Sequence, residues 1–202
     1  MTPDDRAIGR VTRCSTRGFV GAVRLPEPEW PVFGTFCRAE AQQGRSQVIG
    51  LIYDLSIEDD ELARQLAATE SIPAEQLADS QVNRQVPVEY RALAVGYREG
   101  DRFVQSLPPQ PPLTLAPIHR LSDADVRTFT ARLDFLKLVL AVQEIPVDDL
   151  VAAALQTAAA ARPESERRAY LVEAAAECAR LMGRDLTRLE SLVRSLRPTG
   201  AA

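Results

Sequence analysis

The first 55 residues contain four short runs that each have the pattern of a β-strand. The runs cover residues 8–11, 19–25, 34–39 and 47–54, and glycine- or proline-containing segments separate them. Short β-branched and aromatic runs bounded by such residues are typical of strands. Because the runs follow one another closely, their spacing favours a small barrel or sandwich over an alternating βαβ sheet.

Two further strand patterns lie beyond an interruption. Ser56 can cap a helix, and the acidic residues after it suit the first helical turn, so we expect a helical insertion at about 56–84. Strand patterns return at residues 86–97 and 102–104. Residues 107–112 contain four prolines. This segment cannot form a helix interior or a central strand, so we expect a stiff linker or an extended arm packed along the barrel.

From Ser122 onward the apolar residues recur at helical spacing. Pro146 ends the first helix, and Gly183 is a C-terminal cap. The pattern predicts four helices, at residues 122–142, 147–155, 163–182 and 186–196. We therefore expect an α+β protein: a small antiparallel β-barrel with a helical insertion over 1–115, then a four-helix bundle over 116–202.

Composition limits the class of protein. The 202 residues are 46% hydrophobic and 26% charged, which is ordinary for a soluble globular chain. No apolar run approaches the roughly 18 residues of a membrane helix, and the N-terminus lacks an apolar signal core. We expect a cytoplasmic protein without a membrane partner. The net charge of −4 argues against duplex DNA binding as the main task, but it leaves room for a local basic patch.

The sequence offers no set of residues for catalysis. Lys137 is the only lysine and has no glycine near it, which excludes a Walker-type phosphate loop within the chain. His119 is the only histidine, and no nucleophile or orienting partner accompanies it. Cys14, Cys37 and Cys178 have neither disulfide-framework nor metal-site spacing, and we expect buried, inert thiols. The prediction is a non-enzyme with no catalytic residue, cofactor or metal.

Two groups of residues are candidates for binding. Trp30 and Phe33 lie in a stiff, apolar, proline-containing loop that either plugs the barrel end or anchors a partner. Arg10, Arg13 and Arg17 lie on the first strand and its turn. Arginines with aromatic residues on a barrel face can bind single-stranded nucleic acid by charge and stacking.

The strand pattern resembles the HAS-barrel, a domain shared by HerA-type DNA translocases and ATP-synthase subunits. The resemblance rests on residues 8–11 (Ile-Gly-Arg-Val), 18–20 (Gly-Phe-Val), 32–36 (Val-Phe-Gly-Thr-Phe) and 48–54 (Val-Ile-Gly-Leu-Ile-Tyr-Asp). The proline-rich segment 107–112 is similar to the exit of that barrel. The resemblance covers about residues 6–120, and other small barrels such as the PRC type share parts of these motifs.

In the translocases a RecA-like ATPase follows the barrel, whereas here helices follow it and no phosphate loop exists. What the resemblance implies is therefore a non-catalytic role in assembly or docking. The leading hypothesis is an adaptor that associates with itself or with a protein partner, such as a HerA-type ATPase. The alternative is a barrel that binds single-stranded nucleic acid, and a third hypothesis is an enzyme whose site forms across subunits.

Overall fold

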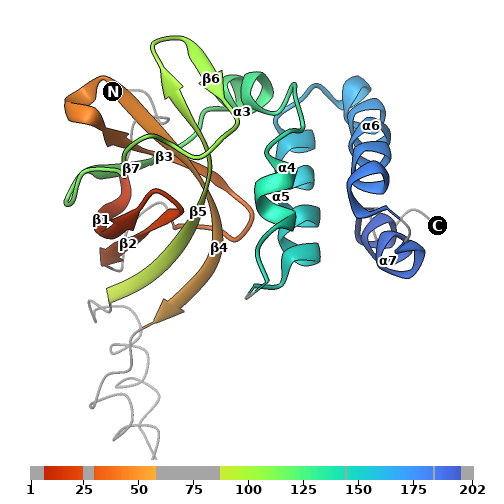
Figure 1. Ribbon diagram of the computed structural model, residues 1–202, viewed down its shortest axis with the longest axis horizontal. Coiled ribbons are helices and arrows are strands. Elements are labelled where there is room, and N and C mark those ends of the chain that lie inside the picture. The colour runs from red at the N-terminus through yellow and green to blue at the C-terminus, as the bar shows by residue number, and fades with distance from the viewer. Residues whose placement is uncertain (1–6, 25–29, 58–86, 144, 184, 197–202) are drawn as a thin grey trace, which may run out of the picture.

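The computed structural model describes residues 7–24, 30–57, 87–143, 145–183 and 185–196 (Figure 1). A β-barrel occupies one side of the molecule and helices occupy the other. The strands are β1 (Ala7–Ser15), β2 (Gly18–Arg24), β3 (Phe36–Ala41), β4 (Ser46–Ile57), β5 (Pro87–Glu99), β6 (Arg102–Val104) and β7 (Pro117–Arg120). The helices are α3 (Asp123–Phe129), α4 (Leu136–Leu140), α5 (Val147–Ala160), α6 (Glu164–Met182) and α7 (Leu186–Leu196), with a short 3₁₀ turn, η2, at Gln42–Gly44.

Six strands close the barrel. They follow the order β2-β1-β7-β3-β4-β5, and an additional pairing of β2 with β5 completes the ring. All pairings are antiparallel, and β6 extends the sheet by pairing with β5. This confirms the predicted α+β class. Strand β7 lies beyond residue 115, so the barrel includes residues that the sequence analysis grouped with the helices.

The barrel interior is a small apolar core. Strand residues alternate between the two faces of a sheet, so every second side chain points inward. The inward set includes Val11, Phe19, Val48, Tyr90 and Ile118, all of them buried. The hydroxyl of Tyr90 donates a hydrogen bond of 3.1 Å to the backbone oxygen of Ile8, which satisfies a polar group that burial would otherwise leave unpaired.

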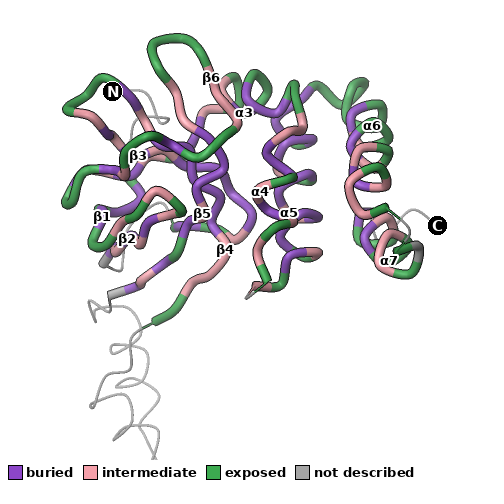
Figure 2. Tube along the Cα trace, in the orientation of Figure 1, coloured by how far each residue is buried: buried purple, intermediate pink, exposed green. Residues whose placement is uncertain are grey.

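A second apolar core joins the barrel's outer wall to the helices. Phe36, Ile49, Leu51 and Val95 are buried on the barrel side of this core. The Phe36 ring meets the rings of Phe129 and Phe135 edge to face, at centroid distances of 5.8 and 5.7 Å. Helix α5 is buried along much of its length, whereas α6 and α7 are more exposed (Figure 2). The barrel wall that faces the helices thus carries buried apolar side chains on its inner face, in the first core, and on its outer face, in the second core.

The expected helix 122–142 is two helices. Ser122 caps α3 as predicted, accepting a hydrogen bond from the Asp125 N–H. However, α3 ends at Phe129, and α4 begins at Leu136. The amide of Gln105 donates to the backbone oxygens of Phe129 and Arg132 between them. In a continuous helix, backbone N–H groups further along the helix would donate to these two carbonyls. Here the side chain of Gln105, which follows β6, donates to them instead, so the helix is interrupted where it contacts the barrel.

Other sequence predictions have mixed outcomes. The third predicted helix corresponds to α6, and its cap Gly183 has φ +66°, which favours glycine. The prediction that Ser56 caps a helix is wrong, because β4 runs through Ile57 and pairs with β5 there. The remainder of the expected insertion 56–84 lies outside the described residues. The described part holds five helices in place of the four that were expected after residue 115.

The proline-rich segment is an extended arm packed along the barrel, one of its two predicted forms. Pro112 forms a bridge with Ala41, and its oxygen accepts a hydrogen bond from the Cys14 thiol at 3.2 Å. The N–H of Leu115 donates to the Val11 oxygen at 2.8 Å. The Ala116 N–H then donates to the Leu113 oxygen at 3.1 Å, which closes a four-residue turn that leads into β7.

Candidate functional site

Two β-bulges shape one region of the barrel's outer surface. The pairing of β1 with β2 shifts between Val11 and Arg13, and the pairing of β4 with β5 shifts between Ile52 and Asp54. Strict alternation through Thr12 and Tyr53 would place Arg13 on the same face as Val11, and Asp54 on the same face as Ile52, inside the barrel. The bulges turn both charged side chains outward. Bulges that re-aim side chains in this way are common near binding sites.

Three arginines meet in this region. Arg13 on β1 pairs in register with Val20 on β2, and Val20 pairs with Arg91 on β5. Residues directly opposite one another in a sheet point to the same face, so these three side chains share the outer face. Arg17 lies in the turn between β1 and β2 and is exposed. The fold thus gathers Arg13, Arg17 and Arg91 from sequence positions almost 80 residues apart.

These arginines line a groove between the barrel and the segment after α4. Its walls include Tyr53 on the barrel side and Val142 and Ile145 on the helical side. We call it the arginine groove, defined by Arg13, Arg17, Arg91, Tyr53, Val142 and Ile145. Its volume is about 680 Å³. That is within the range of sites that bind small ligands.

The charges of the groove are only partly compensated. Arg13 Nη2 lies 3.1 Å from Glu89 Oε1, and the two side chains are 68% and 20% exposed. Arg91 Nε lies 3.8 Å from Asp54 Oδ2, with both side chains 48% exposed. Among the described residues, no ion pair involves Arg17. Ion pairs open to solvent contribute little to stability, so Arg91 can exchange partners at low cost, and Arg13 keeps an exposed guanidinium beside the partly buried Glu89.

Arg10, the third arginine of the predicted nucleic-acid set, does not line this groove. Its Nη1 donates a hydrogen bond of 3.0 Å to the backbone oxygen of Leu115, and its strand neighbours are Ala22 and Pro117. The structure therefore brings Arg13 and Arg17 together and assigns Arg10 to the turn at residues 113–116. Sequence reasoning missed Arg91 and Tyr53, because only the pairing of β2 with β5 and the bulge in β4 bring them to the groove.

No protein-family model matches this chain, and a comparison with curated proteins finds no match. Across the parts of the chain that the structure describes, no three His, Cys, Asp or Glu residues gather where they could hold a metal ion. None of the helices described is long and apolar enough to cross a bilayer.

Trp30 and Phe33, the predicted partner interface, have different environments. Phe33 is half-buried and packs against the core between barrel and helices. Trp30 is 47% exposed, and its neighbour Val32 is exposed too. Gly34 follows with φ +77°, and a Cβ there would lie 2.4 Å from that of Ala153, so only glycine lets the segment pass α5 this closely. Phe33 thus fixes the segment, and Trp30 is the member that is open to solvent.

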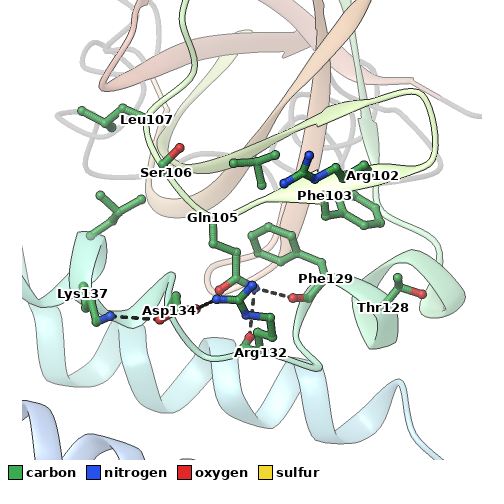
Figure 3. Close-up of a pocket in the computed structure, with 12 residues that line it drawn as sticks. Arg102, Phe103, Gln105, Ser106, Leu107, Thr128, Phe129, Arg132, Asp134 and Lys137 are labelled. Carbon is green, nitrogen blue, oxygen red and sulfur yellow. Dashed lines mark hydrogen bonds and ion pairs between the residues drawn. The ribbon is translucent and has the colours of Figure 1, made fainter.

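A second hollow, of about 480 Å³, lies beside Gln105 (Figure 3). Gln105 donates to Phe129 and Arg132 there and accepts from the Phe135 N–H at 2.9 Å. Asp134 pairs with Lys137 and Arg132, and the hydrogen bond from Lys137, then that from Arg132, lowers its pKa. The side chains of Gln105 and Asp134 thus bond neighbouring groups of the chain, which indicates a structural contact between the end of β6 and the helices.

The remaining sequence candidates are dispersed. His119 is half-buried on β7, and Lys137 belongs to the Asp134 cluster. Cys37 and Cys178 are buried, whereas Cys14 is only partly buried. Burial raises the pKa of Cys37 and brings that of Cys178 to about 11, so both stay protonated near neutral pH.

Proposed function

We propose that this chain is a non-enzymatic assembly or adaptor protein that docks on a protein partner through its barrel. The docking element is the turn at residues 113–116, which follows the proline-rich arm and is hydrogen-bonded to β1 and β3. The resemblance of the strand pattern to a HAS-barrel makes a HerA-type ATPase the first partner to test. The resemblance supplies the candidate partner, whereas the exposed apolar side chains of the turn supply the surface.

The observation that carries the proposal is Leu115. Its φ is +64°, in the left-handed region that favours glycine. For other residues this conformation costs about 1–2 kcal/mol. Leu115 is nonetheless 66% exposed, and Leu113, at the other side of the turn, is 39% exposed. The fold thus keeps an exposed apolar residue in a strained backbone conformation, although its side chain packs little within the chain. This combination favours a role in contact with another molecule.

The turn is held firmly enough to act as a docking element. The Leu115 N–H donates to Val11 at 2.8 Å, and the Leu115 oxygen accepts from Arg10 at 3.0 Å. The Leu113 N–H donates to the Glu40 oxygen at 2.8 Å. An apolar group that is fixed before binding loses less conformational entropy when it docks.

The experiment combines the purified chain with a HerA-type ATPase from the same organism and measures complex formation by size exclusion with light scattering. Wild type is expected to co-elute, and Leu115→Gly is expected to weaken the complex about tenfold. Glycine relieves the backbone strain, so the thermal midpoint of Leu115→Gly should equal or exceed that of wild type. A chain that stays monomeric and forms no complex overturns the proposal, as does a Leu115→Gly variant that binds equally well.

Trp30 gives an independent readout because it is the only tryptophan and is half-exposed. If the docked surface extends over it, its emission shifts to shorter wavelength on complex formation and quenching by acrylamide falls. The partner's own tryptophans are replaced by phenylalanine for this measurement. Unchanged Trp30 emission in a complex that light scattering confirms would remove Trp30 from the interface and leave the turn.

A further inference from the structure

The arginine groove concentrates positive charge on a chain whose net charge is −4. Arg13, Arg17 and Arg91 contribute three guanidinium groups, and no carboxylate is among the described residues that line the groove. Glu89 and Asp54 contact two of these groups from its margin. The docking role proposed for the 113–116 turn makes no use of this cluster.

The guanidinium groups suit phosphate. Each presents a planar fork of N–H donors that matches two phosphate oxygens, and arginine is more weakly hydrated than lysine. Arg13 and Arg91 are in register across β1, β2 and β5, with Val20 between them. Arg17 extends the set along the turn at the end of β1. The three groups are therefore arranged along a surface, as the successive phosphates of a strand would require.

The rest of the groove suits a base more than a simple ion. Tyr53 lies at the bulge in β4, is half-buried, lines the groove and also packs against the core between barrel and helices. Val20, Leu93 and Val142 add apolar surface beside it. A site for inorganic phosphate needs only donors, whereas an aromatic ring beside cations is the combination that binds single strands through stacking and charge. The volume of about 680 Å³ admits a nucleotide or two of such a strand.

We propose that the arginine groove binds a short stretch of single-stranded nucleic acid, with Arg13, Arg17 and Arg91 on its phosphates and Tyr53 stacked on a base. This goes beyond the adaptor role and requires no partner protein. Arg17 should contribute most per side chain, because no described carboxylate competes for it. Arg91 exchanges its half-exposed pair with Asp54 for phosphate, and the exposed guanidinium of Arg13 turns from the partly buried Glu89 to phosphate.

The test measures binding of a fluorescent oligothymidylate to the full chain by anisotropy at several salt concentrations. Each phosphate neutralised in a single strand contributes about −0.7 to the slope of log K against log salt, so three arginines predict a slope of about −2. Arg17→Ala should weaken binding several-fold and make the slope shallower by about 0.7. Arg168→Ala is the matched control, because it removes the same charge from an exposed position on α6.

Tyr53 distinguishes stacking from charge alone. Tyr53→Phe keeps the ring and should bind like wild type, whereas Tyr53→Leu should lose about fivefold or more. The thermal midpoint of each variant is measured so that a loss of binding can be separated from a loss of fold. Equal binding by Tyr53→Leu and wild type, with both folded, contradicts the stacking part of the proposal.

Competitors identify the source of the phosphate. Unlabelled single strands should displace the probe at lower concentration than duplex of equal phosphate content, inorganic polyphosphate or a mononucleotide. Polyphosphate that competes as well as the strand overturns the assignment to nucleic acid. No binding at about 50 mM salt, or an unchanged affinity of Arg17→Glu, overturns the site itself. None of these results bears on docking through Leu115, which is assayed without nucleic acid.

Discussion

At the scale of single residues, the three cysteines lie in different environments. The thiolate is the reactive form of cysteine, so a raised pKa and burial both suppress reaction. Burial raises the pKa of Cys178 to about 11 and also raises that of Cys37. Cys14 is only partly buried and lines the arginine groove. Reaction of the native protein with an aromatic disulfide at pH 8 should therefore give a fast phase from Cys14 alone.

The variant Cys14→Ser is the control for this prediction. It should abolish the fast phase and leave two thiols that react after unfolding in denaturant. Fast reaction of two or more thiols in folded protein would contradict the burial of Cys37 and Cys178. The sequence predicted inert thiols from spacing and apolar context, but it could not distinguish Cys14, whose exposure depends on how the distant Pro112 covers it.

At the scale of elements, Gln105 determines where one helix ends and the next begins. Its side chain makes hydrogen bonds to Phe129, Arg132 and Phe135. Gln105→Ala leaves these backbone groups without their partner, at about 1–3 kcal/mol for each buried one. We expect a fall in the free energy of unfolding of about 2 kcal/mol, measured by urea denaturation. Arg102→Ala, at an exposed position on nearby β6, is the matched control.

The turn before α4 gives a dependence on pH. Hydrogen bonds from Lys137 and then Arg132 lower the pKa of Asp134 in the folded state. A lowered folded-state pKa gives stability that is present above the unfolded pKa, near 3.9, and is lost as pH falls through the folded value. Asp134→Asn should remove this component, so the difference in thermal midpoint between wild type and variant should shrink below about pH 4. A constant difference from pH 7 to pH 3 would contradict it.

Local patterns predicted most elements, but contacts between elements decided the exceptions. The strands of the barrel followed from short apolar runs, and the cap at Ser122 followed from its own side chain. The break between α3 and α4 did not, because Gln105 lies outside the helical pattern that it interrupts. β7 was missed because Pro117 and the short run after it have the pattern of a linker between barrel and helices. Only the pairing of this run with β1 and β3 makes it a strand.

The same limit applies to the candidate site. Arg13 and Arg17 could be proposed from the sequence because both lie on one hairpin, but Arg10 was grouped with them only by proximity along the chain. Side-chain alternation alone places Arg13 on the same face as buried Val11, and the bulge at Thr12 has no clear sequence signature. Arg91 and Tyr53 join the groove through the closure of the barrel, which no local pattern encodes.

At the scale of the whole molecule, the barrel and the helices depend on one another. The barrel wall formed by β3, β4 and β5 has a buried inner face and an equally buried outer face, where Phe36, Ile49 and Leu51 meet the helices. A fragment of residues 1–115 lacks β7, so β1 and β3 lose the strand between them. A fragment of residues 1–121 keeps β7 but exposes the apolar outer wall to water.

We therefore expect neither fragment to form a stable monomer. The second should aggregate or bind a hydrophobic dye, because removing the helices uncovers large apolar side chains. Exposing apolar surface to water costs roughly 25 cal/mol per Å². Urea unfolding of the full chain should give coincident transitions by fluorescence of Trp30, which precedes β3, and by far-ultraviolet dichroism, to which the helices contribute most. A cooperative, dye-negative monomer of residues 1–121 would show that the barrel is an independent domain and that the helices are an addition to it.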